Sequence, residues 1–370
     1  MSHRSFKVTA CAISSLAVGV LGCGSSASPA GATAPAAAAD AASAPSADPG
    51  YSVQDGNNLP VPATADGIQL ETPDYDANNV NAAHMIVQPN QEIFLCYYIT
   101  LPNKTELDVG QFQSWMSPGS SHHFIVYEEK GGSVLNATPQ PSGSIQSCGV
   151  ASGNWVYATS TPGAIVSSTM PAGVGLPFAA GEQIVLNMHF INTGSTALYP
   201  KVKLNILTAK NVQYKAGALV SFNTSINVPA ATPSGPGKQT VNGTCTVTAG
   251  SKIFSMSTHT HKHATAALVN FVSGGVSQEI VHTGITATYP AEQRNGTGTD
   301  WEHPGVSLWK GPDFLTANSG DSFTYSCSYE NTASSAVTVG ETAASNEMCM
   351  AVGYYYPAGT VSCQDTASSN

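Results

Sequence analysis

The sequence consists largely of short runs of alternating or β-branched residues, and this pattern most limits the possible fold. Clear examples are residues 67–70, 92–99 and 124–127. Glycine and proline separate these runs at loop intervals, and no long stretch has the periodicity of an amphipathic helix. Many short strands with turn signals between them are typical of β-sandwiches and barrels. The chain is therefore predicted to be all-β.

Composition limits the class of partner. Of the 370 residues, 10% are charged, and the net charge is −10. There is no block of basic residues, which argues against nucleic acid as a partner. Low charge together with many small polar residues suits an exported β-rich protein.

The N-terminus is predicted to direct export. Arg4 and Lys7 precede an apolar run at 8–21, and Gly22 and Cys23 follow it. This order resembles a bacterial lipobox, in which the signal is cut before Cys23 and the cysteine carries lipid. An ordinary signal peptide cleaved nearby is the alternative, and the run is short for a membrane span. We expect a bacterial lipoprotein anchored by lipid to a membrane, at the cell envelope or cell surface.

The rest of the chain divides by composition. After the signal at 1–23, residues 24–50 are mainly Ala, Ser, Pro, Gly and Thr. Such a segment cannot bury enough apolar surface to offset its ordering entropy, so we predict a flexible, disordered linker. The strand-rich remainder forms two predicted domains, 51–209 and 210–364. Residues 365–370 are a short tail.

Six cysteines lie beyond the signal region: Cys96, Cys148, Cys245, Cys327, Cys349 and Cys363. An even number in an exported chain favours disulfides over free thiols. Metal binding by cysteine is the alternative, and the absence of a CxxC pair weakens it. The residues alone do not choose among the possible pairings.

Two histidines, His259 and His261, lie in a segment that has largely strand character. Side chains at i and i+2 of a strand point to the same face, so both imidazoles are predicted to project together toward one metal. His263 continues this alternation, and we assign it to the surroundings of the site or to the surface. Two imidazoles make an incomplete metal site, so another segment must supply a ligand.

A double histidine, His122 and His123, opens an apolar strand. Neighbours on a regular strand face opposite ways, so both reach one metal only where the backbone is bent, as at a strand entrance or bulge. Taken alone, such a pair is more often an incidental surface feature. His189 lies in another apolar strand, where a lone histidine is more often a hydrogen-bonded core residue. Next to the pair, it would complete a three-imidazole site.

Met348 lies in the apolar segment 346–357. Methionine in an apolar strand usually fills the core. As a ligand, its thioether would select copper, especially Cu(I), over zinc.

In this order, the motifs resemble the ascorbate-dependent type II copper monooxygenases. The matching motifs are His122-His123, Met188-His189-Phe190, His259-Thr260-His261 and Glu347-Met348-Cys349. The similarity runs from about residue 67 to 363, and it includes the contexts 171–175 and 301–304. Each motif is weak evidence by itself, whereas four in the right order are strong evidence.

The resemblance implies a fold of two consecutive antiparallel β-sandwiches, jelly-roll-like, which face each other across a solvent-filled cleft. It also implies two copper ions per chain. The electron-transfer copper would be bound by His122, His123 and His189. The copper where O2 and substrate meet would be bound by His259, His261 and Met348. An external reductant such as ascorbate would recharge both.

The same match implies the disulfide pairing. Cys245–Cys363 and Cys327–Cys349 would lie in the second domain. Cys96–Cys148 would remain for the first domain.

The chain departs from the peptide-amidating branch of the family. Ser257 stands where that branch has an arginine that binds the substrate carboxylate. Val352 stands in place of a tyrosine, and Asn187 in place of a glutamine. Because the copper ligands are intact while the carboxylate-binding residue is missing, we predict hydroxylation of a C–H bond in a small organic substrate, and no peptide amidation.

Two other functions fit parts of this pattern. A non-catalytic cell-surface protein on the same scaffold would bind copper without substrate-dependent consumption of O2. A zinc hydrolase would need a carboxylate base beside an open three-ligand site, but there is no HExxH motif and Met348 would be a poor zinc ligand. The leading prediction is an enzyme whose partners are a small substrate, O2, a reductant and a membrane.

Overall fold

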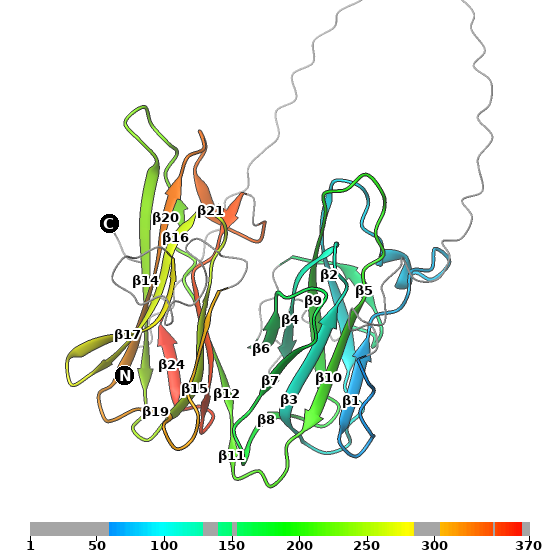
Figure 1. Ribbon diagram of the computed structural model, residues 1–370, viewed down its shortest axis with the longest axis horizontal. Coiled ribbons are helices and arrows are strands. Elements are labelled where there is room, and N and C mark those ends of the chain that lie inside the picture. Colours follow the sequence, from blue (N-terminus) through cyan, green and yellow to red (C-terminus); the bar gives the residue numbers. More distant parts are fainter. Residues whose placement is uncertain (1–58, 129–139, 150–153, 285–303, 343–344, 365–370) are drawn as a thin grey trace, which may run out of the picture. The chain divides into compact units, whose positions relative to one another are not determined.

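The computed structural model describes residues 59–128, 140–149, 154–284, 304–342 and 345–364. These residues form strands β1 to β24 and one 3-10 turn at Ala82–His84, with no α-helix among them (Figure 1). The all-β prediction is therefore confirmed. In the part of the chain that is described, no helix is long and apolar enough to cross a membrane.

Several predicted features lie outside the described residues. These are the signal with Cys23, the linker at 24–50, the tail at 365–370, and the context residues 301–303. They stay predictions.

A first sheet has six strands in the order β1-β10-β3-β8-β11, with β7 also paired to β3. Its strands are β1 (Gly67–Glu71), β3 (Leu107–Met116), β7 (Val166–Thr169), β8 (Val174–Phe178), β10 (Val202–Thr208) and β11 (Tyr214–Lys215). All its pairs are antiparallel except β8 with β11. Since β11 follows residue 210 but pairs with β8, this strand belongs to the first sheet.

A second sheet has the antiparallel order β5-β2-β9-β4-β6. Its strands are β2 (Gln91–Thr100), β4 (Ser121–Glu128), β5 (Ile145–Ser147), β6 (Asn154–Thr159) and β9 (Gln183–Asn192). The central strand β9 is buried on both faces along almost its whole length. This burial explains why apolar residues occupy both faces of the strand instead of alternating with polar ones.

The later part of the chain forms three more sheets. One has the order β12-β23-β15-β18, with β19 paired to β15. Its strands are β12 (Gly217–Phe222), β15 (Lys252–His259), β18 (Val306–Leu308), β19 (Leu315–Thr316) and β23 (Met350–Tyr356). A small sheet has the order β13-β21-β22, with strands β13 (Asn227–Val228), β21 (Val337–Val339) and β22 (Asn346–Glu347).

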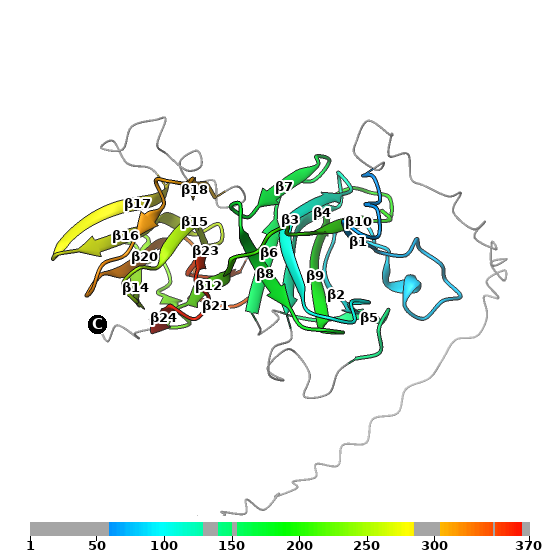
Figure 2. The same ribbon diagram turned by 90° about the horizontal axis from the view of Figure 1, so that it is seen from below.

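The last sheet has the order β17-β16-β20-β14-β24 (Figure 2). Its strands are β14 (Gly237–Val247), β16 (Ala264–Ser273), β17 (Val276–Gly284), β20 (Ser322–Asn331) and β24 (Val361–Gln364). Every second residue of β20 is buried, from Phe323 to Asn331. This period of two places one face of the sheet on the core.

Two large buried clusters each join residues of two sheets. Phe112 of β3 and Phe124 of β4 belong to the first cluster. Met256 of β15 and Tyr325 of β20 belong to the second. Burial of apolar surface between sheets is the main stabilising term for such folds. The jelly-roll-like division into domains 51–209 and 210–364 stays a prediction.

The structure contains three disulfides, Cys96–Cys148, Cys245–Cys363 and Cys327–Cys349. These are the three pairs that the family resemblance implied. Cys96–Cys148 links β2 to the loop that follows β5, the strand paired with β2. The other two disulfides lie in the later sheets.

Candidate metal centre

Three histidines, His122, His123 and His189, converge between β4 and β9. One potential ligand atom from each lies within 4.8 Å of the others. The ring centroids are 5.1 Å apart for His122 and His123, and 5.0 Å and 4.9 Å from these two rings to His189. The register of β4 against β9 shifts between Ser121 and His123, so His122 occupies an irregularity in the strand. Such an irregularity redirects a side chain, and it lets two consecutive histidines reach the same place.

His189 is held firmly from one side. Its Nε2 lies 2.8 Å from a carboxylate oxygen of Glu92, and the ring of Phe94 stacks on it at a centroid distance of 4.0 Å. With Nε2–H donated to the carboxylate, Nδ1 is the unprotonated nitrogen. Within the described part of the chain, this buried Nδ1 has no hydrogen-bond partner. A buried polar atom without a partner is costly, and a metal ion would satisfy it.

Burial keeps these imidazoles neutral. Burial, with a smaller contribution from the neighbouring His122, lowers the pKa of His189 to about 3. Burial also holds the pKa of His123 well below its usual range. Since a histidine binds metal through an unprotonated nitrogen, this cluster is prepared for a metal at neutral pH.

The second predicted ligand set lies where β15 ends. His259 is the last residue of β15, and its ring centroid is 5.4 Å from that of His261. Burial lowers the pKa of His259 to about 3 and that of His261 to about 4. Both side chains line one cavity of about 160 Å³ together with Met348. The alternation predicted to continue to His263 is wrong, because the strand stops at His259.

A buried carboxylate, Glu347, fixes the segment beyond β15. Its Oε2 accepts the backbone N–H of His261 at 2.8 Å, and its Oε1 accepts that of His263 at 2.6 Å. The N–H of Met348 also donates to Oε2, at 3.3 Å. Burial raises the pKa of Glu347 more than these backbone N–H groups lower it, so that its pKa is about 7. One carboxylate thus ties the histidine segment to the methionine segment.

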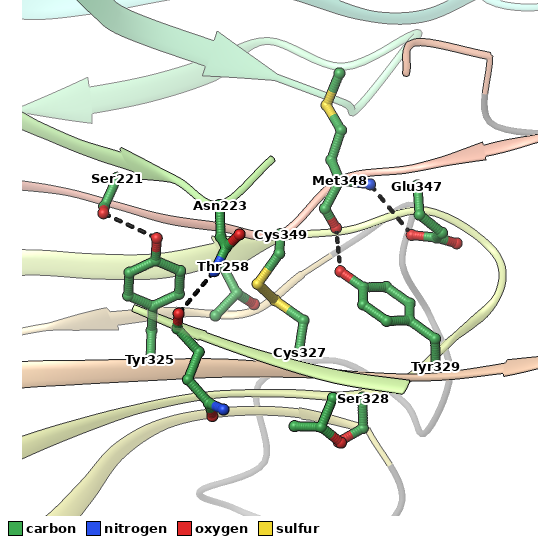
Figure 3. The surroundings of a disulfide bond; sticks show 12 residues. Ser221, Asn223, Thr258, Tyr325, Cys327, Ser328, Tyr329, Glu347, Met348 and Cys349 are labelled. Carbon is green, nitrogen blue, oxygen red and sulfur yellow. Dashed lines mark hydrogen bonds between the residues drawn. A yellow bond between two sulfur atoms is a disulfide. The ribbon is translucent and has the colours of Figure 1, made fainter. Parts of the chain in front are cut away.

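Met348 lies between β22 and β23, beside a disulfide. Cys349 bonds to Cys327 of β20, and the Tyr329 hydroxyl donates to the Met348 carbonyl at 2.7 Å. Figure 3 shows the thioether pointing away from this disulfide. The backbone of Met348 is therefore held while its sulfur extends into the cavity with His259 and His261.

The two ligand sets adjoin in the structure. The ring centroids of His123 and His259 are 6.2 Å apart. Trp155 of β6 packs edge-on against His259 at 5.7 Å. A larger cavity of about 820 Å³ is bordered by His122, His123 and His259.

Together, the donor sets fit copper. A cluster of three imidazoles suits a copper ion that alternates between Cu(I) and Cu(II), and two imidazoles with a thioether favour Cu(I). The carboxylate of Glu92 behind His189 is the kind of partner that orients a metal-binding histidine. The ligation itself stays a prediction.

Four residues that shape the site were not assigned a role from the sequence. Glu92, Phe94 and Trp155 reach the histidines from other strands, so no local motif marks them. Glu347 adjoins Met348 in the sequence, but its hydrogen bonds to His261 and His263 bridge more than eighty residues. Asn187, one of the departures noted above, donates to the Gly149 carbonyl at 2.9 Å beside the Cys96–Cys148 disulfide.

Comparison with known proteins adds a family. Residues 309–370 match the model of the copper type II ascorbate-dependent monooxygenase, C-terminal domain. No curated protein matches the chain.

Among solved structures, the major capsid protein P2 from bacteriophage PM2 is 9% identical, with a TM-score of 0.33 and coverage of 78% of this chain and 97% of that one. A recombinant N-glycanase F (PNGase F) is also 9% identical, with a TM-score of 0.34 and coverage of 80% and 99%. Such low scores support no conclusion about this chain, whereas the family match does. Residues 309–370 are thus similar to the C-terminal domain of the copper type II ascorbate-dependent monooxygenases, which supports the family indicated by the sequence motifs.

Proposed function

We propose that this protein is a copper-dependent monooxygenase that hydroxylates a C–H bond of a small organic substrate. It uses O2 and an external reductant such as ascorbate. Two copper ions bind per chain, one to His122, His123 and His189, and one to His259, His261 and Met348. The protein works outside the cytoplasm, on two jelly-roll-like sandwiches tethered to a membrane through Cys23.

The observation that supports this proposal most is the convergence of all six predicted ligands into two adjoining sets. Potential ligand atoms of three histidines from β4 and β9 converge, and the buried Nδ1 of His189 has no hydrogen-bond partner in the described structure. His259, His261 and Met348 line a second spot. A zinc hydrolase does not account for the Met348 thioether, which is a soft ligand that favours copper over zinc.

The chain's own residues prepare the reaction. Copper, when bound, supplies the one-electron steps that reduce O2 and insert one oxygen atom into a C–H bond. Glu92 holds the Nε2 proton of His189, which leaves Nδ1 for the metal. Phe94 stacks on the His189 ring and Trp155 packs edge-on against the His259 ring, which helps to orient both imidazoles. Glu347 accepts hydrogen bonds from the backbone N–H groups of His261 and Met348, and so fixes the backbone at both ligands.

Copper content tests the proposal. The full chain, loaded with copper and desalted, should retain two copper ions per molecule. A His259→Ala/His261→Ala variant and a His122→Ala/His123→Ala variant should each retain about one, and His84→Ala should retain two as a matched control. Copper content of one or none with zinc retained instead would refute the assignment.

Oxygen consumption separates an enzyme from a copper-binding protein. With ascorbate present, a substrate screen should find a compound that raises O2 uptake and that gains one oxygen atom from O2. Full copper occupancy without any substrate-dependent uptake would favour the non-catalytic copper-binding function on the same scaffold.

A further inference from the structure

A cavity of about 820 Å³ lies next to the predicted ligands His122, His123 and His259, which form part of its wall. This volume is in the range of sites that enclose small organic molecules. The cavity therefore places a molecule of that size directly beside the proposed centre of oxygen chemistry. Its wall indicates what kind of molecule fits.

The wall of this cavity is rich in aromatic rings. The six rings belong to Trp155, Tyr157, Phe254, Trp309, Phe314 and Tyr354. Phe254 and Tyr354 lie almost parallel, with centroids 5.8 Å apart and an interplanar angle of 8°. The hydroxyl groups of both tyrosines are engaged, since Tyr157 pairs with Ser114 and Tyr354 donates to the Val156 carbonyl. Their rings, not their polar ends, are thus left for a ligand.

Charge is scarce on this wall. Apart from the histidines, Lys310 is the one lining residue with a charged side chain among those that the structure describes, and it is exposed. Nearer to His259, the hydroxyl of Ser257 donates to the Gly305 carbonyl at 2.7 Å. Opposite it stands the apolar side chain of Val352. This part of the wall offers no ion to a charged ligand.

The rim of the cavity is apolar as well as exposed. Val306 and Leu308 of β18 both line the cavity, yet 51% and 64% of their surfaces remain accessible. Large exposed apolar side chains next to a pocket mark a place where an apolar partner enters. The rim and the wall of the cavity therefore both favour an apolar ligand.

From these observations, we propose that the cavity binds an uncharged, largely apolar molecule with an aromatic or similarly bulky hydrocarbon body. Calling this molecule the substrate depends on the proposed function. The binding itself does not, because it uses rings and methyl groups of the chain alone.

Two fluorescent probes with the same ring frame test the proposal. N-phenyl-1-naphthylamine is neutral, and 1-anilinonaphthalene-8-sulfonate adds one negative charge. Titrated into the full chain after chelation of metal, the neutral probe should bind at one site and at least about tenfold more tightly than the sulfonate. The described wall has one permanently charged side chain, the exposed Lys310, so little offsets the desolvation of the sulfonate. Tighter binding of the sulfonate, lost in Lys310→Gln, would overturn the proposal in favour of an anionic ligand.

Arginine substitutions locate the probe. Val352→Arg should weaken binding of the neutral probe by about tenfold or more and strengthen binding of the sulfonate, since it places a cation in the wall. Leu308→Arg, at the exposed rim, should act in the same direction without disturbing the core. Val276→Arg is the matched control, because Val276 is 71% exposed on β17 and does not line the cavity.

The outcomes separate this proposal from the function. Unchanged binding of the neutral probe in both Val352→Arg and Leu308→Arg would show that it binds elsewhere and would overturn the proposal. Copper content is measured independently. Probe binding with no copper uptake would therefore reject the monooxygenase function and keep the apolar site, and the reverse result would reject only the apolar site.

Discussion

Ser257 of β15 and Val352 of β23 are direct register partners, so their side chains share one face of the sheet. These are two of the three positions at which the chain departs from the peptide-amidating branch of the family. Both line the large cavity beside His259. The two departures are thus one local change in the wall, in which a hydroxyl and an isopropyl group stand where that branch has an arginine and a tyrosine.

A glycine-extended peptide should therefore not be hydroxylated. The Ser257 hydroxyl already donates to the Gly305 carbonyl, and Val352 offers no hydrogen bond to a carboxylate. Incubation with copper, ascorbate and O2, followed by mass spectrometry for the hydroxyglycine product, checks this expectation. Turnover of such a peptide would show that another residue binds its carboxylate.

Met348→Leu should remove the second-site chemistry and keep the fold. Leucine nearly preserves the volume but offers no sulfur, so the loss of stability should be below about 1.5 kcal/mol. Oxygen insertion should be abolished, and the copper–sulfur contribution to X-ray absorption of the reduced protein should disappear. Copper at the His122, His123 and His189 cluster should remain.

Met350 provides the matched control for that variant. It lines the same small cavity, two residues further along the chain. Met350→Leu should keep both the sulfur signal and the activity. An active Met348→Leu protein, or a sulfur signal lost only in Met350→Leu, would mean that the second ligand set is assigned wrongly.

At the first ligand set, His122→Ala should instead impair electron delivery.

Glu92→Leu should weaken copper binding at the three-histidine cluster. The carboxylate accepts the Nε2 proton of His189, and loss of such a partner typically costs about 10- to 100-fold in metal affinity. Glu92→Gln keeps an oxygen acceptor and should retain most of the affinity. Competition against a copper chelator measures both variants. Equal affinity for Glu92→Leu and the wild type would show that Phe94 alone orients the ring.

The strand pattern and the ligand motifs are visible in the sequence because both depend on neighbours in the chain. β20 alternates, and β9 is mainly apolar between Ile184 and Ile191. The bend at His122 is required if both histidines are to bind one metal, but residues 120–123 contain no sequence signal that predicts a bulge there. It comes from pairing with β9.

Long-range packing explains what the sequence does not show. The end of β15 at His259 coincides with the hydrogen bonds that Glu347 makes to His261 and His263. These backbone groups turn to the carboxylate rather than continue a strand ladder. Neither this contact nor the one between Glu92 and His189 has a local signature, because each joins distant parts of the chain.

The metal-free protein should lose stability as pH falls below about 6.5. The pKa values of His189 and His259 are about 3 and that of His261 is about 4, against 6.5 for an unperturbed imidazole. Between these pKa values, the unfolded chain binds protons that the native protein does not. The free energy of unfolding therefore decreases as the pH falls, by up to about 1.4 kcal/mol per pH unit for each histidine. Urea unfolding from pH 7 to 4.5 measures this slope.

One buried group acts in the opposite direction. The pKa of Glu347 is raised to about 7 from 4.5, so between these values the native protein binds a proton that the unfolded chain does not, and stability rises as pH falls. Burial also raises the pKa of Glu92, and these two carboxyl groups oppose a larger number of buried histidines, so the net slope keeps its sign. His189→Leu should reduce the slope, and a free energy of unfolding that stays level down to pH 4.5 would contradict the expectation.

Glu347→Gln should loosen both segments of the second site at once. The carboxylate accepts backbone N–H groups on both oxygens, whereas an amide has one acceptor and directs its NH2 group at a donor. Leaving a buried N–H without its partner costs about 1–3 kcal/mol. Glu330→Gln, in an exposed pair with Lys238, is the matched control and should cost at most about 1 kcal/mol. Urea unfolding at pH 8 and copper counting should show a less stable chain that retains about one copper ion. Wild-type stability with two copper ions would mean that the disulfide and Tyr329 suffice to hold Met348 in place.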